Sequence, residues 1–202
     1  MPIDALVLAT RNEGKLRELA RILGRQISLA GLDAFPGAPD VPETGATFEA
    51  NALLKARAIA AYTKLPTVAD DSGLCADALN GMPGVLSARW AGQHGDDQAN
   101  LDLLLAQIAD VPDARLGARF VCAAALAVPA NGMPREWVVT GQVEGRLIRA
   151  PRGTGGFGYD PIFQAGGFDL TTAEMTPDAK DAISHRGRAF RALVPFITGS
   201  LT

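Results

Sequence analysis

The segment IDALVLATRNEGKLRELARIL, residues 3–23, indicates the fold class of this chain. Its first part, Ile3 to Ala9, is an apolar run with the length of a buried strand. Apolar residues then recur between Leu16 and Leu23 at the i, i+3, i+4 and i+7 spacing of an amphipathic helix. The polar segment Thr10 to Lys15 joins the two. A strand, a short polar loop and a helix open an α/β unit, in which the helix N-terminal amides face the loop.

The rest of the chain predicts more elements of both kinds. Further strands are expected at residues 26–30, 66–69, 119–128 and 136–143. Further helical segments are expected at residues 47–64, 96–109 and 177–198. Gly24 is a plausible stop for the first helix, and Thr47 is a good N-cap for the second. Asn131-Gly132 favours a hairpin turn, and the last helical segment is expected to break near Gly187 and to kink or end at Pro195. We therefore expect one mixed α/β domain around a sheet, with the hairpin half forming a second lobe.

Composition excludes several classes of protein. The 202 residues are 48% hydrophobic and 20% charged, which is typical of an ordered globular domain. No apolar run approaches the roughly 20 residues of a membrane span, and no secretion signal is visible, so the cytoplasm is the expected location. The net charge of −3 argues against a nucleic acid polymer as partner. Cys75 and Cys122 are far apart without a CxxC motif, which favours two buried thiols over a disulfide or a zinc site.

The segment Thr10 to Lys15 is the first candidate for a binding site. It lacks the GxxxxGK[ST] spacing of a P-loop, so that motif is rejected. The ingredients of an anion site are present nevertheless, because a strand delivers the loop, a helix N-terminus follows it and Lys15 adds a point charge. The alternative is an ordinary turn with a solvated lysine.

Two adjacent carboxylates, Asp70 and Asp71, come directly after the strand predicted at 66–69. Ligands of open α/β sheets bind beyond the carboxyl ends of the strands, and Mg²⁺ prefers oxygen ligands. Neighbouring carboxylates also raise one another's pKa, which can make one of them a base. Glu43, on a Pro- and Gly-rich loop, is a possible second oxygen ligand. The alternative is an Asp-rich turn with a capping role.

The Gly-rich segment Gly153 to Asp160 is the third candidate. Glycine permits close approach of the backbone to a ligand, and Phe157 among the glycines is able to present its face to a base. Asp160 is able to accept a hydrogen bond from a ring N–H. The alternative is a flexible linker whose phenylalanine packs on the core.

Lysine is scarce in this chain, with 15 Arg against only 4 Lys. Lys15 and Lys55 each lie in or beside a candidate segment, and Lys180 lies in a late basic cluster with Ser184-His185-Arg186-Gly187. Lys64 is explained by the dipole at a helix C-terminus. A flexible ammonium suits a polyphosphate better than the planar fork of arginine does. The alternative for the late cluster is a solvated helix face.

The order of these segments resembles the inosine triphosphate pyrophosphatase family, also described as dITP/XTP pyrophosphatases. The landmarks are LATRNEGKLREL (8–19), PETGATFEANALLKA (42–56), ADDSGL (69–74), GMPGVLSARWAG (81–92), GTGGFGYDPIF (153–163) and AISHRG (182–187). The resemblance implies an elongated, bilobed single domain over residues 1–202, with a nucleotide cleft between the lobes. It further implies hydrolysis of ITP, dITP or XTP to the monophosphate and pyrophosphate, dependence on Mg²⁺, and a homodimer.

The resemblance also implies roles for single residues. The triphosphate would be cradled by Thr10, Arg11, Asn12, Glu13, Gly14 and Lys15. Glu43 and Asp71 would hold Mg²⁺, with Asp71 also activating water and Asp70 supporting both. Phosphate charge would be neutralised by Lys55, Lys180 and Arg186, and Ser72 would touch the substrate. The base would be held by Phe157, Gly158, Tyr159 and Asp160 and read at its 6-position by His185 and Arg186. Arg11 departs from the family's TGN pattern, which leaves the geometry of this loop open.

Hydrogen bonding offers a hypothesis for how the base is selected. A 6-keto purine offers N1–H as a donor and O6 as an acceptor, so Asp160 would accept from N1–H while a donor near His185 serves O6. Adenine reverses both groups and leaves buried partners unpaired, which discriminates by up to about 10⁴. Two alternatives remain open. One is a related pyrophosphatase for modified pyrimidine or methylated nucleotides, and the other is a non-catalytic nucleotide sensor.

Overall fold

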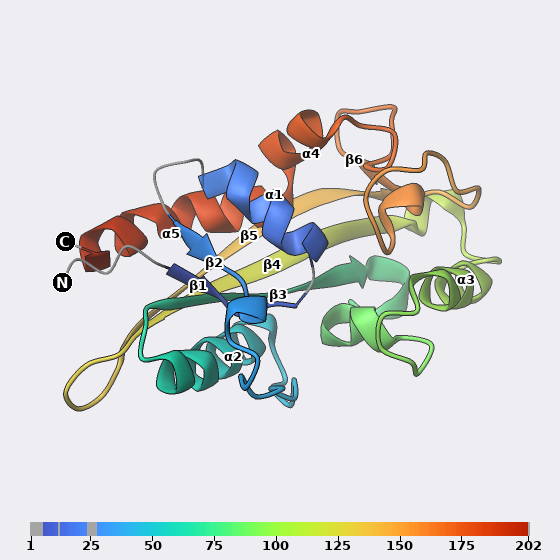
Figure 1. Ribbon diagram of the computed structural model, residues 1–202. Coiled ribbons are helices and arrows are strands. Elements are labelled where there is room, and N and C mark those ends of the chain that lie inside the picture. Colours follow the sequence, from blue (N-terminus) through green and yellow to red (C-terminus); the bar gives the residue numbers. More distant parts are fainter. Residues whose placement is uncertain (1–5, 12, 24–27, 202) are drawn as a thin grey trace. The chain divides into compact units, whose positions relative to one another are not determined.

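The computed structural model describes residues 6–11, 13–23 and 28–201 (Figure 1). The described helices are α1 (Glu13–Leu23), α2 (Phe48–Thr63), α3 (Asp97–Gln107), α4 (Pro177–Ile183) and α5 (His185–Leu201). The described strands are β1 (Leu6–Leu8), β2 (Leu29–Ala30), β3 (Thr67–Ala76), β4 (Gly117–Val128), β5 (Arg135–Leu147) and β6 (Phe163–Ala165). They form one sheet in the order β2-β1-β3-β4-β5-β6. Strand β1 is parallel to β2 and β3, while β5 and β6 are antiparallel. The predicted mixed sheet flanked by helices is confirmed.

The chain divides into two compact units. Unit 1 consists of Met1–Asp71, Cys122–Gly141 and Arg186–Thr202, and unit 2 consists of Ser72–Val121 and Gln142–His185. A single bilobed domain with a nucleotide cleft stays a prediction.

Alternation along β1 builds the core of unit 1. Leu6 and Leu8 pack with α1 and α5, in a cluster that includes Leu19 and Phe190. Val7, between them, packs with Ile59 of α2. Because successive side chains of a strand point to opposite faces, one three-residue strand serves two helical layers. Figure 1 shows α1 and α5 on one side of β1 and β3, with α2 on the other.

Helix α3 is the main apolar element of unit 2. Its inward side chains Leu101 and Leu104, with Ile108 at the C-cap, are nearly inaccessible and pack against residues of β3, β4 and β5. The N-cap is Asp96, whose carboxylate accepts from Ala99 N at 3.0 Å. Thr47 likewise caps α2 by accepting from Ala50 N, as predicted from the sequence.

The strand predicted at 66–69 was too short. Strand β3 continues through Asp70 and Asp71 to Ala76, so the two carboxylates lie within a buried strand and not in a turn after it. Burial of adjacent charges is tolerated because each carboxylate has cationic partners, described below.

The final helical segment also differs from its prediction. The break lies at Ser184, whose backbone is extended, and Gly187 lies inside α5. Pro195 lies inside α5 as well and does not end it. Its side chain is on the exposed face, so the helix loses one hydrogen bond without losing packing.

Some predictions fall partly outside the described residues, namely Gly24 as a helix stop, Asn12, and the first residues of the strands expected at 3–9 and 26–30. The short edge strand β6 was missed, because three residues carry too little periodicity to be recognised. Cys75 and Cys122 are free and buried, which confirms the prediction of two buried thiols. Within the described part of the chain, no helix has the length and apolar character needed to cross a bilayer.

We predict that Leu104→Ala destabilises the protein by about 3 kcal/mol, because it leaves a cavity at a fully buried position of α3. Urea unfolding at neutral pH measures this free energy. The matched control is Leu103→Ala, one residue earlier on the same helix, where the side chain is 36% exposed. Equal losses in the two variants would contradict the packing described for α3.

Candidate functional site

Two neighbouring residues of β3, Asp70 and Asp71, organise the charged cluster of unit 1. Neighbours on a strand point to opposite faces. Asp70 therefore contacts Lys15 of α1 and Arg186 of α5, and Asp71 contacts Asn51 and Lys55 of α2. Asp70 thus contacts the layer of α1 and α5, and Asp71 contacts α2. The apolar side chains of β1 are divided between the same two layers.

Asp70 is the centre of a buried ion network. Lys15 Nζ lies 3.1 Å from its Oδ2, and Arg186 Nε donates to the same oxygen at 3.3 Å. Arg186 Nη1 also donates to Glu18 Oε2 at 2.5 Å. Glu18, Asp70 and Arg186 are each 3% exposed or less. Glu18 was not singled out from the sequence, since nothing there separates it from an exposed glutamate of a helix.

The charge state of Asp70 follows from this network. Burial acts to raise the pKa of its carboxyl, but Lys15 and Arg186 overcome that effect and hold the pKa far below its usual range. Asp70 is therefore ionised at every physiological pH, and it is not a proton acceptor. Its contacts make it the residue that fixes the lysine ammonium at the start of α1.

Asp71 lies in a different environment. Asn51 Nδ2 donates to its Oδ2 at 2.9 Å, and Lys55 Nζ lies 3.6 Å from its Oδ1. The same Lys55 ammonium donates to Glu43 Oε1 at 2.6 Å. Asn51 also accepts from Gly45 N at 2.7 Å, which ties the loop of Glu43 to the start of α2. Asn51 is a further residue that sequence reasoning did not place in the site.

The pKa of Asp71 is shifted in the opposite direction from that of Asp70. Burial raises it, Lys55 lowers it and the nearby Glu43 carboxylate raises it, with a net upward shift. Burial acts to lower the pKa of Lys55, but Asp71, Asp70 and Glu43 together raise it above its usual value. Two adjacent aspartates with separated pKa values are a pattern of acid–base sites, in which the one with the higher pKa is able to accept a proton.

The donor set of this cluster suits a hard cation. Glu43 and Asp71 present carboxylate oxygens to one ammonium, so a positive charge is already accommodated between them. Over residues 6–11, 13–23 and 28–201, no group of three or more His, Cys, Asp or Glu side chains is placed to hold a metal ion. A pair of carboxylates is nevertheless what Mg²⁺ uses when water and phosphate oxygens complete its shell.

The loop before α1 is partly described. Arg11 Nη2 donates to Ala38 O at 2.8 Å, and its Nε lies 3.5 Å from the exposed Asp40 carboxylate. Among the described residues other than glycine, only Lys64 and Asn80 have positive φ, so Arg11 is not strained. Asn12 and the side chain of Glu13 lie outside the described residues. The roles of Thr10 and Gly14 stay predictions.

In unit 2, the Gly-rich segment is a fixed loop and not a linker. Asp160 is 3% exposed, and its Oδ2 accepts from Phe157 N at 2.8 Å while its Oδ1 accepts from Thr172 Oγ1 at 2.7 Å. Gly155 N donates to Ala173 O at 3.0 Å. A side chain at Gly156 would collide with the Asp160 carboxylate, which explains the need for glycine there.

Lys180 contacts this loop, and we call residues 153–160 with Thr172 and Lys180 the loop cluster of unit 2. Its Nζ donates to Asp160 Oδ2 at 2.6 Å and lies 5.3 Å from the centroid of the Phe157 ring, which is 40% exposed. The assignment of Lys180 to phosphate stays a prediction, but these contacts favour a place beside the base. Asp160 already has three donors within the protein, so its geometry favours orienting Lys180 over reading a base directly.

The other residues expected at the base differ in exposure. Tyr159 is buried, and its hydroxyl donates to Ser87 O at 2.9 Å, so its side chain braces the loop. His185 is also buried and stacks on Phe120, with ring centroids 4.9 Å apart and planes 14° apart. Phe120 was not singled out from the sequence. Ser72 is half-buried in unit 2, whereas Arg186 belongs to unit 1 and is engaged by Glu18 and Asp70.

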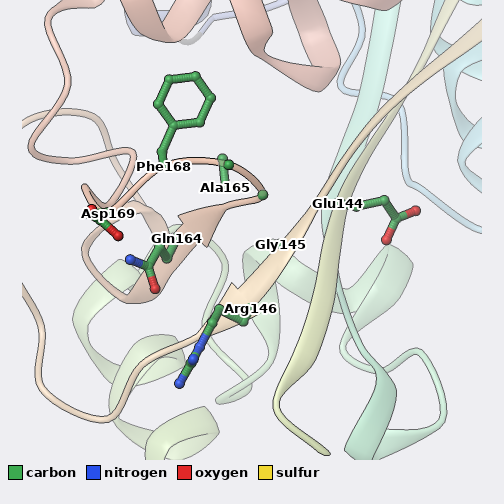
Figure 2. A pocket seen from close by; sticks show the side chains of 9 residues that line it. Glu144, Gly145, Arg146, Gln164, Ala165, Phe168 and Asp169 are labelled. Carbon is green, nitrogen blue, oxygen red and sulfur yellow. The ribbon is translucent and has the colours of Figure 1, made fainter. Parts of the chain in front are cut away.

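A cavity of about 450 Å³ lies at the β5–β6 edge of unit 2, and its lining side chains are drawn in Figure 2. Its charged lining residues are Glu144, Arg146 and Asp169, and Phe168 projects from the loop after β6. None of the residues predicted for binding or catalysis lines it. The cavity is therefore not part of the candidate site.

Comparisons with known proteins agree with this architecture. The model of the Ham1 family matches residues 6–196. A protein of Streptomyces coelicolor named dITP/XTP pyrophosphatase is 64% identical over 195 residues, which are 95% of this chain and 96% of that protein. A crystal structure from Mycobacterium abscessus, described as a nucleoside-triphosphatase or dITP/XTP pyrophosphatase, is 55% identical with a TM-score of 0.77 and covers 95% of this chain and 99% of that one. A HAM1 protein of Coxiella burnetii is 41% identical with a TM-score of 0.86 over 96% of this chain and 98% of that one.

We predict that Asp70→Asn destabilises the protein by about 3 kcal/mol at pH 7, because it removes a carboxylate that pairs with the buried Arg186 guanidinium. Since the pKa of Asp70 is lowered by folding, its contribution is complete above the unfolded pKa of about 3.9 and falls as the pH drops below that value. The difference from wild type should therefore narrow between pH 5 and pH 3.

Urea unfolding at several pH values measures this difference. Asp102→Asn, at an exposed position of α3, is the control and should leave the stability nearly unchanged at each pH. A difference between Asp70→Asn and wild type that stays constant with pH would contradict the ionised network.

Proposed function

The chain belongs to the Ham1 family, and we propose that it hydrolyses non-standard purine nucleoside triphosphates, ITP, dITP and XTP, to the monophosphate and pyrophosphate. Several close relatives carry the name dITP/XTP pyrophosphatase at 50–64% identity. In this proposal the enzyme removes deaminated purines from the nucleotide pool. The observation that carries it is the charged cluster of unit 1, in which two adjacent aspartates of the buried strand β3 orient Lys15 and Lys55.

The charged cluster is proposed to hold the phosphates. Lys15 and Lys55 present ammonium groups that are already oriented by Asp70, Asp71 and Glu43. Phosphoryl transfer needs little covalent chemistry from a protein, because positioning and neutralisation of charge supply most of the rate. Lysines fixed by buried carboxylates meet that need, since little reorganisation is left for the reaction itself.

Asp71 is proposed to accept the proton of the attacking water. The water oxygen forms the new bond to the α-phosphorus. The bond between the α-phosphorus and the oxygen that bridges it to the β-phosphate breaks, and pyrophosphate leaves with that oxygen. Asp71 suits this task because its pKa is raised, whereas Asp70 stays ionised and fixes Lys15. Glu43 and Asp71 would hold Mg²⁺, which when bound supplies neutralisation of phosphate charge.

The loop cluster of unit 2 is proposed to hold the base. The exposed face of Phe157 offers a stacking surface, and Lys180 beside it is a donor suited to the O6 of a 6-keto purine. The amino group of adenine at the same place would face a donor and leave both unpaired. Asp160 orients the ammonium of Lys180 and the backbone at Phe157 together.

The proposal also includes the location and the oligomeric state of the enzyme. We propose a cytoplasmic location, which is consistent with two cysteines that are both free thiols. We also propose a homodimer, which rests on the family resemblance and is tested by the mass of the purified protein in solution.

We predict pyrophosphate release from ITP, dITP and XTP in the presence of Mg²⁺, at a kcat/KM at least about 100-fold above that for ATP. The assay measures pyrophosphate and orthophosphate separately over a panel that also contains GTP and dUTP. A preference for dUTP or a methylated nucleotide would favour the related pyrophosphatase. Orthophosphate as the product would contradict cleavage between the α- and β-phosphates, and binding without turnover would indicate a sensor.

We predict that Asp71→Asn still binds nucleotide but lowers kcat by at least about 100-fold, because the amide is not a base. Calorimetric titration with ITP measures binding, and pyrophosphate release measures turnover. Near-normal turnover by the variant would remove Asp71 as the base.

A further inference from the structure

The Gly-rich loop Gly153 to Asp160, which is proposed to hold the base, accepts support from a carboxylate in a distant part of the chain. Gly158 N donates to Asp97 Oδ2 at 2.9 Å, across 61 residues of sequence. Asp97 is the first residue of α3 and lies outside every motif singled out from the sequence. A hydrogen bond to an ionised acceptor is stronger than one between neutral groups, so this contact is suited to hold backbone in place.

Helix α3 fixes the position of this carboxylate. The helix is anchored by Leu101, Leu104 and Ile108 in the core of unit 2. Next to it along the chain, Asp96 caps the first turn, and Asn100 Oδ1 accepts from Ala91 N at 2.7 Å. Asp97 therefore projects from a rigid element, although its own side chain is exposed.

The contact acts on the part of the loop that presents the aromatic ring. Gly158 has a φ of 61°, the left-handed conformation, and directly follows Phe157. On the other side of Gly158, the Tyr159 hydroxyl is bonded to Ser87 O. Asp97 thus supports the backbone of Gly158 directly, next to a side chain that is fixed by a bond of its own.

Asp160 holds this backbone at Phe157, where its N–H donates to Phe157 O at 3.3 Å and its carboxylate accepts from Phe157 N at 2.8 Å. Its carboxylate accepts from Phe157 N, Thr172 Oγ1 and Lys180 Nζ, so it fixes one end of the turn and the ammonium. The N–H of Gly158 is satisfied by Asp97 instead. Without Asp97, the peptide between Phe157 and Gly158 would lose the acceptor of its N–H and keep the Asp160 N–H at its carbonyl, beside the ring that lies 5.3 Å from Lys180 Nζ.

We propose that Asp97 is a positioning residue for base selection, which holds the Phe157–Gly158 peptide so that the ring and the Lys180 ammonium present one fixed surface to the base. This inference rests on the proposed function, because it assigns the loop to the base. It predicts an effect on recognition of the base and not on the chemistry at the phosphates, which belongs to the charged cluster of unit 1.

The test compares Asp97→Ala with Asp97→Asn, whose side-chain oxygen is still able to accept from Gly158 N. For Asp97→Ala we expect the KM for ITP to rise about tenfold with kcat within about twofold, and the preference for ITP over ATP to fall by a similar factor. Asp97→Asn should keep most of that preference. Asp102→Ala, at an exposed position on the same helix, is the control and should behave as wild type.

A second readout does not depend on activity. Hydrogen exchange of the Gly158 amide, resolved by NMR, should be at least about tenfold faster in Asp97→Ala than in wild type, and nearly unchanged in Asp97→Asn and Asp102→Ala. Thermal unfolding of the variants shows whether a change is confined to the loop.

The outcomes separate the two proposals. If wild type releases no pyrophosphate from ITP or XTP, the proposed function fails, while the exchange of Gly158 still reports whether Asp97 holds the loop. If wild type is active and Asp97→Ala keeps its preference for ITP, the positioning role is overturned. It is equally overturned if Asp97→Asn is as impaired as Asp97→Ala, or if kcat falls and KM does not.

Discussion

Two carboxylates adjacent on a buried strand are the constraint on which unit 1 depends. A strand sends neighbouring side chains to opposite faces, so Asp70 and Asp71 cannot share one set of partners. One face supplies Lys15 and Arg186, and the other supplies Asn51 and Lys55. Burying an aspartate costs several kcal/mol unless it is paired, and each helical layer therefore brings cations to the strand. The helices around β3 are held by this charge pairing as well as by apolar contacts.

Because they face opposite sides of β3, Asp70 and Asp71 differ in their acid–base chemistry. Asp70 has Lys15 and Arg186 close to one oxygen and stays ionised, whereas Asp71 shares Lys55 with the Glu43 carboxylate and has a raised pKa. One aspartate thus orients a lysine, while the other is suited to accept a proton. The difference arises from the surroundings, with Lys15 and Arg186 lowering the pKa of Asp70 and the Glu43 carboxylate helping burial to raise that of Asp71, and not from the residue type, which is identical.

In unit 2, the Gly-rich loop Gly153 to Asp160 is likewise held by a buried carboxylate, that of Asp160, and it presents the uncharged ring of Phe157. Its glycines allow a tight turn that places the Asp160 carboxylate against the backbone, and its aromatic ring remains exposed beside a lysine. Glycine gives the loop its shape but also gives it freedom, so the loop requires bonds from outside. Thr172, Ser87 and Asp97 supply them from three separate segments of the chain.

The sequence by itself determined the fold class, the main helices, the hairpin strands and the segments that carry charge, because these follow from local periodicity, capping and composition. It also placed Glu43, Lys55, Asp70, Asp71, Phe157 and Asp160 among the candidates. Only the tertiary structure decided that the two adjacent aspartates lie within a strand, that Arg186 is buried against Glu18, and that Lys180 lies with Asp160 and Phe157. The supporting residues Glu18, Asn51, Asp97 and Phe120 could not be found from the sequence. Their contacts join segments far apart in the chain, and no local pattern records which distant group a side chain meets once the chain has folded.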